Sequence, residues 1–340
     1  MLGLRRTGKT SLLYTGLKLL EYPWIIIDCR VFEEKMYIPR ADMLKVFEES
    51  LNKAVRRHRG LVGFLRNVEE VSIYGLTLRL KTSSREPLLY RILESLNQYA
   101  KERRTRIVIA FDEAQEMVKL RGLRLLPIIA YAYDKLRNIT VILTGSQVGL
   151  LYRFLGVDNP GSPLYGRMAT EIRLSNLERG DARRFLIEGF KQYGVEAPGE
   201  LIEEALDVLD GNIGWLTYFG AHSVRYGATR DVLRRTVIEA SKLALRELDN
   251  FLMIRPRATA RRYILILLAA AEGANTWSRI KRFVELEEGA RISDSILYNL
   301  IGNLLDAGFL ERLDRTYRIP DPILKIALRE KGRMLARRYR

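Results

Sequence analysis

Eight consecutive residues near the start of the chain have the types and spacing of a loop that holds nucleotide phosphates. They are Gly3, Leu4, Arg5, Arg6, Thr7, Gly8, Lys9 and Thr10, and together with Ser11 they form the expected nucleotide contacts. The glycines let backbone N–H groups turn toward the phosphates, Lys9 brings a positive charge to the β- and γ-phosphates, and the Thr10 hydroxyl can ligate Mg²⁺. The pattern predicts binding of ATP or GTP, and chance occurrence is the alternative.

A second group of reactive residues is the pair Asp112 and Glu113, which ends the apolar run that begins at Ile107. The run predicts a buried strand, because parallel strands covered on both faces read as continuous apolar segments. Asp112 would hold the water shell of Mg²⁺ opposite Thr10, and Glu113 would polarise the water that attacks the γ-phosphate. The alternative is that both acids only cap the following helix. The order of the two motifs favours the catalytic interpretation.

Two further positions are candidates for contact with the γ-phosphate. The apolar run 139–144 predicts a strand whose polar end carries Thr144 and Ser146, and we favour Ser146 as the sensing hydroxyl. The alternative is an ordinary turn rich in Gly and Ser. Arg167 can stabilise charge on the γ-phosphate in its own subunit or in a neighbour's, which would require a homo-oligomer. The alternative for Arg167 is a solvated side chain.

The elements that position these residues alternate between helix and strand, which predicts an α/β P-loop fold with a parallel sheet. The expected elements are a helix from Ser11, strands at 24–28, 106–113, 139–144 and 170–174, helices at 42–59 and 87–103, and an inserted hairpin at 71–80. Only Met1 and Leu2 precede the loop, and two residues are too few for a typical strand. We therefore expect an upstream segment to supply the first strand; the alternative is that the chain fills this place in another way.

The composition describes a globular chain with a basic surface. The 340 residues carry 57 Lys and Arg against 41 Asp and Glu, a net charge of +16, which makes a polyanionic partner plausible, although much of the charge lies in mixed pairs. No apolar stretch is long enough to span a bilayer and no signal peptide is recognisable, so we expect a cytoplasmic protein without membrane contact. The single Cys29 and two histidines exclude an internal disulfide and a His/Cys zinc cluster.

The C-terminal half predicts two helical parts. Amphipathic helices at 179–193, 200–209, 215–226 and 230–252 form a lid. Three helices between 259 and 307, followed by a hairpin at 309–319, resemble a winged helix-turn-helix, with Ile296 among the inward-facing residues of the third helix. That helix could enter the major groove of double-stranded DNA. Its outer face is polar rather than basic, so a protein-binding winged helix is the alternative.

The motifs together resemble the archaeal ATPase family within the STAND branch of AAA+-like P-loop ATPases. The resemblance covers nearly the whole chain and is carried by residues 3–10, 28–30, 71–80, 111–115, 144–146, 163–167 and 210–216. It implies ATP rather than GTP, Mg²⁺, and three parts: a core at 1–176, a helical lid at 177–254 and a winged helix at 255–340. Ile213 stands where the family usually has a proline near the base.

We therefore expect an ATP-binding and ATP-hydrolysing switch in which Lys9, Thr10, Asp112 and Glu113 carry the chemistry. Its nucleotide state would reposition the lid and a winged helix that binds DNA or protein. One alternative is a catalytically weak or inactive adaptor that binds DNA or a protein partner. Another is a defence or signalling STAND ATPase that acts on a protein.

Overall fold

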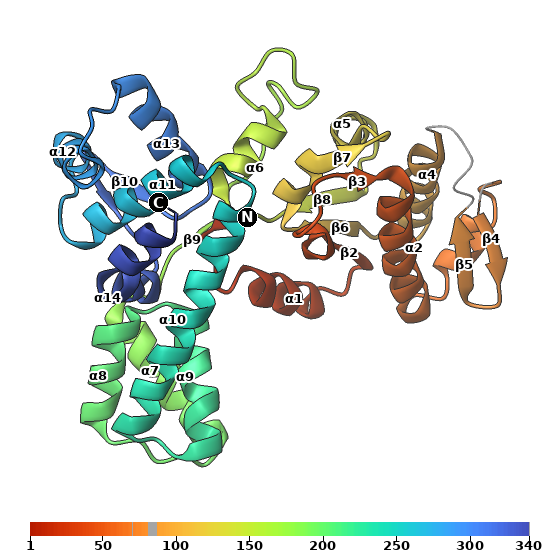
Figure 1. The fold of residues 1–340 in the computed structure, drawn as a ribbon. Coiled ribbons are helices and arrows are strands. Elements are labelled where there is room, and N and C mark those ends of the chain that lie inside the picture. Colours follow the sequence, from red (N-terminus) through yellow and green to blue (C-terminus); the bar gives the residue numbers. More distant parts are fainter. Residues whose placement is uncertain (70, 81–86, 340) are drawn as a thin grey trace. The chain divides into compact units, whose positions relative to one another are not determined.

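The computed structural model describes residues 1–69, 71–80 and 87–339, and the chain folds into two compact units (Figure 1). The first unit consists of Met1–Gly3 and Lys9–Arg173, and the second of Leu4–Gly8 and Leu174–Arg340. The middle of the predicted phosphate loop thus belongs to the second unit, whereas both of its ends belong to the first.

The first unit is built on a parallel sheet of three strands, β2 (Trp24–Asp28), β6 (Ile107–Asp112) and β8 (Ile139–Leu143), in the order β2-β6-β8. Every residue of the central β6 is buried, as its continuous apolar sequence predicts. The register sets Asp28 level with Asp112, so the polar residues that follow these strands meet at one edge of the sheet.

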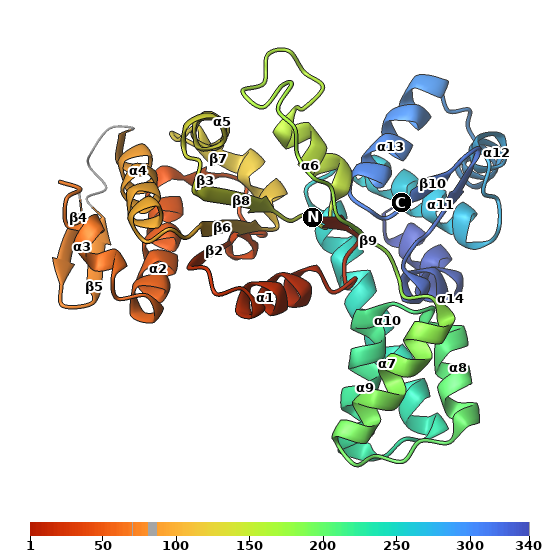
Figure 2. The same ribbon diagram turned by 180° about the vertical axis from the view of Figure 1, so that it is seen from behind.

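Helices cover both faces of this sheet. On one face α1 (Lys9–Leu19) packs Leu13 and Leu17 against Ile26, Val108 and Ala110. On the other face the sheet shares a larger apolar core with α2 (Arg40–Arg57), α4 (Pro87–Glu102) and α5 (Leu125–Lys135), as the view from behind also shows (Figure 2). This three-layer arrangement is the α/β fold that the sequence predicted.

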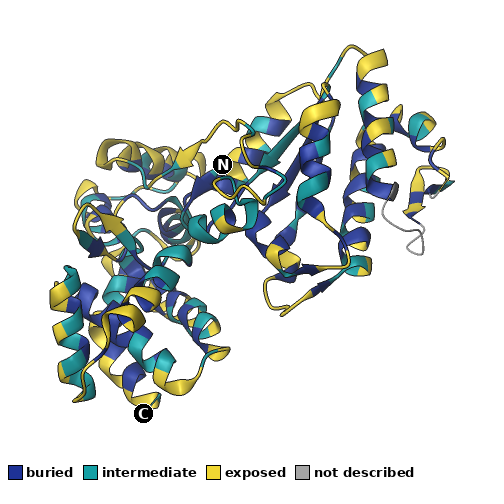
Figure 3. Cartoon of the chain, turned by 90° about the horizontal axis from the view of Figure 1, so that it is seen from above, coloured by how far each residue is buried: buried dark blue, intermediate teal, exposed yellow. Residues whose placement is uncertain are grey.

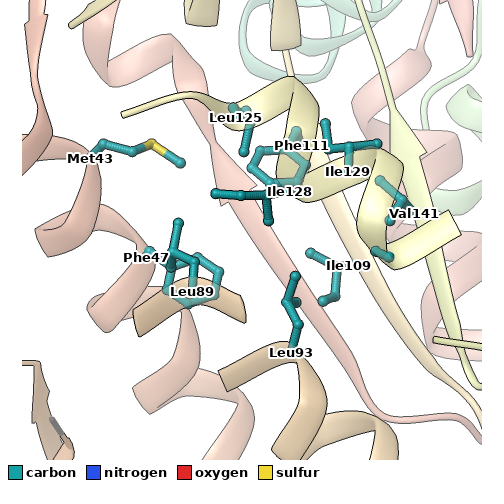
Figure 4. A pocket seen from close by; sticks show the side chains of 11 residues that line it. Met43, Phe47, Leu89, Leu93, Ile109, Phe111, Leu125, Ile128, Ile129 and Val141 are labelled. Atoms are coloured by element: carbon teal, nitrogen blue, oxygen red, sulfur yellow. The ribbon is translucent and has the colours of Figure 1, made fainter. Parts of the chain in front are cut away.

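The larger core contains a small cavity of about 20 Å³ between these three helices and the sheet. Figure 4 shows the apolar side chains that line it, which include Met43, Phe47, Leu89, Leu93, Ile109 and Val141. A cavity of this size holds about one water molecule, but a buried water needs two or more polar partners. The lining offers apolar side chains only, so we interpret the cavity as a dry packing defect.

Shorter elements complete the first unit. They are η1 (Cys29–Phe32), β3 (Ile38–Pro39), α3 (Leu61–Leu65), β4 (Val71–Tyr74), β5 (Thr77–Leu80), η2 (Ala114–Lys119), β7 (Leu120–Arg121) and α6 (Val148–Leu155). The predicted hairpin is confirmed, because β4 and β5 pair antiparallel with Val71 opposite Leu80.

The outermost strands are shorter than the sequence predicted. The apolar run 170–174 contributes only β9 (Arg173–Leu174), and β1 consists of Leu2–Gly3. Within the first unit the Leu2 N–H donates to the Ile172 carbonyl at 2.8 Å, and Leu2 bridges Gly145 in a parallel sense. A neighbour of two residues offers few ladder bonds, which explains why the 170–174 run stays mostly irregular.

The second unit is almost entirely helical. It contains α7 (Arg179–Gln192), α8 (Gly199–Leu209), α9 (Ile213–Tyr226), α10 (Arg230–Met253), α11 (Arg257–Ala271), α12 (Trp277–Glu288), α13 (Asp294–Asp306), β10 (Glu311–Leu313), β11 (Thr316–Arg318) and α14 (Pro322–Arg338). Apolar side chains from the lid helices and from the winged-helix elements form one continuous core. The helix α11 lies within this core, with all residues from 263 to 271 buried; Figure 3 shows the buried residues in dark blue.

Two features of the second unit differ from expectation. The final helix α14 was not predicted; Pro322 occupies its first turn, and the Asp321 side chain caps it by accepting from the N–H groups of Ile323 and Leu324. Ile296 was expected to face inward but is 43% exposed. The buried face of α13 is instead formed by Leu297, Leu300, Ile301 and Leu304.

Candidate functional site

The predicted catalytic residues of the first unit meet at the carboxyl edge of the sheet, where the strand β6 ends in Asp112. This carboxylate is fully buried, and each of its oxygens accepts a hydroxyl hydrogen bond. The Thr10 hydroxyl at the start of α1 donates to Oδ2 at 2.8 Å, and the Thr144 hydroxyl donates to Oδ1. The structure thus joins the end of the phosphate loop to the acidic pair, as the two motifs predicted.

The same two residues form a donor set that suits Mg²⁺. Mg²⁺ prefers oxygen ligands, keeps several waters and is usually held by one or two carboxylates together with substrate phosphates. Asp112 supplies a carboxylate and Thr10 a hydroxyl, and their oxygens lie 2.8 Å apart. The residues present therefore fit a magnesium ion that also binds a nucleotide.

Lys9 is the first residue of α1, and its side chain is buried. Its Nζ donates to the Gly3 carbonyl at 2.7 Å, so the ammonium group bridges the two ends of the loop. The N-terminus of a helix also carries the positive end of the helix dipole. A buried ammonium group at a helix N-terminus is a favourable place for phosphate oxygens.

Glu113 is held in position by three hydrogen bonds. Its Oε2 accepts from the Ser146 N–H at 2.9 Å, from the Ser146 hydroxyl at 2.6 Å and from the Gln115 amide at 2.7 Å. Its φ of +55° lies in the left-handed region, which a non-glycine residue adopts only when its surroundings impose it. The main chain is fixed as well, because the Glu113 N–H donates to the Thr144 hydroxyl oxygen at 3.1 Å.

These surroundings keep the Glu113 carboxylate ionised. Burial desolvates the carboxylate and by itself would raise its pKa, but the hydrogen bonds from Ser146 and Gln115 and the charge of Lys9 act in the opposite direction. The net result is a lowered pKa. A carboxylate that is ionised and oriented can accept a hydrogen bond from a water molecule.

The sequence analysis named Arg30 and Gln115 only as members of the motifs at 28–30 and 111–115, and it assigned neither side chain a contact at the site. The Arg30 guanidinium forms two hydrogen bonds to the Asp28 carboxylate, of 2.8 and 2.6 Å, and its Nη2 lies 3.9 Å from Asp112 Oδ2. Its position shortly after β2, which pairs in parallel with β6, could have indicated that Arg30 lies near the end of β6. Nothing in the sequence alone indicated that the Gln115 side chain turns back to Glu113.

The middle of the loop lies against helices of the second unit. Arg6 Nη1 donates to Glu247 Oε2 of α10 at 3.1 Å and lies 3.5 Å from Asp321 Oδ2, and its guanidinium carbon lies 4.0 Å above the Trp215 ring. Arg5 makes a second, longer ion pair with Glu247 at 3.5 Å. The guanidinium group of Arg6 thus connects the loop to the lid and to the cap of α14.

The main chain of the loop is also attached to the lid helix α9. The Gly214 N–H donates to the Arg6 carbonyl at 2.9 Å, and a Cβ atom at position 214 would lie 2.4 Å from Arg6 Cβ. Only glycine fits at this approach. Gly8 has a φ of +83°, and a Cβ atom there would lie 3.5 Å from the Ile213 side chain. The Ile213 side chain therefore lies against the loop.

Asp321 is the last of the residues that surround the Arg6 side chain. It is partly buried, and its pKa is raised because desolvation outweighs the hydrogen bonds from the Leu324 N–H and Trp215 and the charge of Arg6. The Trp215 Nε1–H donates to Asp321 Oδ1 at 3.0 Å. The same carboxylate therefore contacts the loop arginine, the lid tryptophan and the first turn of α14.

Ser11, Leu4, Thr7 and Arg167 are the remaining residues of the predicted site. Ser11 is exposed on α1. Thr7 is buried, and its hydroxyl donates to the Leu4 carbonyl at 2.8 Å. Arg167 forms hydrogen bonds of 3.1 and 2.5 Å with Asp134 of α5 and another with the Pro163 carbonyl. The recorded hydrogen bonds of Arg167 do not include the acidic pair, so its role at the γ-phosphate stays a prediction.

Comparison with known proteins places this site in a family. Residues 1–219 match the model of an ATPase domain found predominantly in Archaea, and residues 258–319 match the C-terminal winged helix-turn-helix domain of MCM proteins. The chain belongs to this archaeal ATPase family and carries a winged-helix domain. No curated protein matches the sequence.

Two solved structures extend the comparison. The Walker-type ATPase PABY2304 of Pyrococcus abyssi is 34% identical, and the match covers 96% of this chain and 89% of that one, with a TM-score of 0.81. The ORC2 protein of Aeropyrum pernix in ADPNP and ADP complexes is 14% identical, with coverage of 99% and 87% and a TM-score of 0.63. The second likeness is one of fold alone. No helix in the described ranges is long and apolar enough to cross a membrane.

The hydrogen bonds of Glu113 predict a pH-dependent effect of Ser146→Ala. Loss of the hydroxyl should move the pKa of Glu113 upward and lower the free energy of unfolding at pH 7 by about 1–2 kcal/mol. A carboxylate with a lowered pKa stabilises the fold above its unfolded pKa, and this contribution is lost as the pH falls through the folded pKa. The difference in the free energy of unfolding between Ser146→Ala and the unmodified chain should therefore become smaller below about pH 4.3.

Urea unfolding at pH 7 and pH 3 measures this difference, with Thr15→Ala on the exposed side of α1 as the control. An equal loss of stability at both pH values would show that the Ser146 hydroxyl does not act through the Glu113 charge.

Proposed function

We propose that this protein is an ATP-hydrolysing switch whose nucleotide state is coupled to its winged helix. The observation that carries the proposal is the connected set of hydrogen bonds from Thr10 through Asp112 and Thr144 to Glu113 and Ser146. The membership in an archaeal ATPase family and the nucleotide complexes of the ORC2 structure support ATP as the ligand. Each polar group of the set has a task in phosphoryl transfer.

Lys9 would neutralise the β- and γ-phosphates, and Asp112 and Thr10 would hold Mg²⁺, which adds positive charge where negative charge develops. Glu113 is ionised and fixed by Ser146 and Gln115, so it would orient the attacking water and accept its hydrogen bond. Ser146 acts on the nucleotide through Glu113, a refinement of the predicted direct contact with the γ-phosphate. We keep Arg167 as a candidate for charge stabilisation, in its own subunit or across a homo-oligomer.

Two substitutions separate binding from hydrolysis. Lys9→Ala should abolish binding of Mg²⁺-ATP, because the buried ammonium group between the ends of the loop is lost. Glu113→Gln should preserve ATP binding and slow hydrolysis by about a hundredfold or more, because the amide cannot act as a base. Fluorescent-nucleotide titration and phosphate release measure the two effects, with Lys18→Ala on the exposed side of α1 as the control.

Normal hydrolysis by Glu113→Gln would reject the base assignment. Absence of ATP binding by the unmodified chain would instead favour the inactive adaptor among the alternatives.

The coupling between nucleotide and winged helix would pass through Arg6. The loop residues Leu4–Gly8 pack within the second unit, and the neighbours Gly3 and Lys9 belong to the first. A change in loop conformation on phosphate binding would move the Arg6 guanidinium relative to Glu247 and Asp321. Because Asp321 caps α14, such a movement would reach the C-terminal helix directly.

Arg6→Ala should therefore uncouple nucleotide binding from the C-terminal helix α14 of the winged-helix part. In the unmodified chain we expect ATP to change hydrogen exchange at the capped N–H groups of Ile323 and Leu324, and in Arg6→Ala we expect this change to be lost. Arg6→Lys keeps the charge but not the paired hydrogen bonds, and should retain only part of the effect. Arg246→Ala, at an exposed position of α10 next to Glu247, is the matched control. An unchanged response to ATP in Arg6→Ala would contradict the coupling.

The outer face of α13 favours a protein as the partner of the winged helix. A helix that reads bases presents Arg, Lys, Asn or Gln to the groove. The exposed residues of α13 include Ile296 at 43% and Tyr298 at 71%, and Asp294 at its start pairs with Lys281 at 2.8 Å. Exposed apolar and aromatic side chains such as these, on a face that otherwise carries Asp294, Ser295 and Asn299, are typical of protein interfaces. Double-stranded DNA is the alternative, because Arg279, Arg282, Arg312 and Arg315 are exposed on α12 and the hairpin.

Titration of duplex DNA at increasing KCl concentration tests this choice. If the partner is a protein, we expect only weak, salt-sensitive binding in the non-specific range of about 10⁻⁴–10⁻⁶ M at physiological salt. Arg312→Ala should weaken this binding further, and Tyr298→Ala should leave it unchanged. Nanomolar binding that Tyr298→Ala abolishes would show instead that α13 reads DNA.

A further inference from the structure

Arg30 places a guanidinium group at the carboxyl edge of the sheet, beside the acidic pair. It follows β2, and the register of β2 and β6 sets Asp28 level with Asp112. Its Nη2 lies 3.9 Å from Asp112 Oδ2, the same oxygen that accepts from the Thr10 hydroxyl at 2.8 Å. The guanidinium group therefore lies next to the two residues whose oxygens fit Mg²⁺.

The main chain of Arg30 is held in this place by contacts on both sides. Its N–H donates to Asp28 Oδ1 at 3.0 Å, which caps the short helix η1. From η2, Lys119 Nζ donates to the Glu33 carbonyl at 2.8 Å. The segment that carries Arg30 is thus attached to the segment that follows Glu113.

The side chain of Arg30 is held less strongly than its main chain. Its Nε and Nη2 donate to the two carboxylate oxygens of Asp28 at 2.8 and 2.6 Å, and the two side chains are 48% and 36% exposed. Exposed ion pairs contribute little to stability, because water competes for both partners. Little stability is therefore lost when the guanidinium group changes its partner.

Negative charge surrounds the Arg30 side chain. Its pKa is raised, mainly by the hydrogen bonds to Asp28, and the charges of Asp112 and Glu113 act in the same direction. Arg167, the other candidate for stabilising charge, is bound to Asp134 of α5. Of these two arginines, Arg30 is the one whose recorded ion pairs include the acidic pair.

A terminal phosphate suits this guanidinium group. Carboxylates and phosphates both match the fork of an arginine side chain, and a phosphate group carries more charge than the Asp28 carboxylate. Mg²⁺ held by Thr10 and Asp112 would contact the β- and γ-phosphates. Arg30 forms an ion pair with the same Asp112 oxygen, so its charge lies close to the place where the γ-phosphate would be bound.

We propose that Arg30 binds the γ-phosphate of ATP in its own subunit, and that its guanidinium group exchanges Asp28 for this phosphate. ADP lacks the γ-phosphate, so with ADP the guanidinium group would stay on Asp28. Arg30 is thus the residue by which the site distinguishes ATP from ADP. This inference rests on the proposed binding of ATP and adds one contact to that site.

Calorimetric titration with Mg²⁺-ADPNP and Mg²⁺-ADP tests the role of Arg30 without hydrolysis, because the terminal phosphate of ADPNP resists cleavage. Arg30→Ala should weaken ADPNP binding by about tenfold or more, as expected for charged hydrogen bonds. It should weaken ADP binding by less than about twofold, because an exposed ion pair contributes little to the fold. Arg30→Lys keeps the charge but not the fork, so its ADPNP affinity should lie between the two.

Lys35→Ala is the matched control. Lys35 follows β2 in the same segment and forms an exposed ion pair with Asp42, so this variant removes one positive charge and one ion pair. We expect it to change neither affinity by more than about twofold.

Asp28→Asn should act in the opposite direction from Arg30→Ala. It removes the competing charge but keeps an oxygen that accepts from the Arg30 N–H. ADPNP should therefore bind about two- to fivefold more tightly, the range for an exposed ion pair, and ADP binding should stay the same. If the pair had a structural role alone, Asp28→Asn and Arg30→Ala would both weaken the binding of both nucleotides.

Equal weakening of ADPNP and ADP binding in Arg30→Ala would overturn the proposal, because Arg30 would then act on groups that ATP and ADP share. Weaker ADPNP binding in Asp28→Asn would overturn the exchange of partners. If the unmodified chain prefers ADPNP and Arg30→Ala keeps this preference, the role of Arg30 is rejected and the proposed binding of ATP is not. If the unmodified chain binds neither nucleotide, both proposals are rejected.

Discussion

The buried carboxylate of Asp112 is the constraint on which the site of the first unit depends. A carboxyl group without hydrogen-bond partners is very costly in an apolar core, and this one ends a strand that is buried along its whole length. The hydroxyls of Thr10 and Thr144 supply those partners, so the start of α1 and the end of β8 must approach the end of β6. Thr144 uses the same hydroxyl to receive the Glu113 N–H, and Ser146 then fixes the Glu113 carboxylate. The hydrogen bonds that satisfy this one buried carboxylate thus also bring together the residues to which the proposed hydrolysis assigns its chemistry.

The phosphate loop is shared between the two units, and its contacts explain why. Lys9 and Gly3 hold its ends in the first unit, whereas Arg6 is bound by Glu247, Asp321 and Trp215 in the second. Arg6 has a left-handed φ of +64°, which its contacts with Gly214 and Glu247 help to maintain. The loop is therefore shaped by residues more than 200 positions away in the sequence, since Glu247 lies 241 residues after Arg6. The proposed coupling of the loop to the lid rests on these contacts.

Much of this could be predicted from the sequence, for physical reasons. The loop pattern, the acidic pair and the continuous apolar strands are local signals, and parallel pairing brings the ends of β6 and β8 together. The contacts of Arg6 and Arg30 could not be predicted, because they depend on how helices pack and on the register of neighbouring strands. The helix α14 was missed, although Asp321-Pro322 is a recognisable helix start. Ile296 was placed inward by its apolar character alone, whereas the neighbouring Leu297 fills that position.

The continuous core of the second unit has a consequence for how the chain can be divided. Phe251 of α10 packs against Tyr263 of α11 and against Phe309, with ring centres 5.1 and 5.0 Å apart. A cut between the lid and the winged helix would expose these rings and the buried flank of α11 to water. Fragments cut between the lid and the winged helix would therefore aggregate through this apolar surface instead of folding as independent domains. Replacing this winged helix by a different one would therefore require matching substitutions in α10. Substitutions in the lid and in the winged helix thus depend on one another.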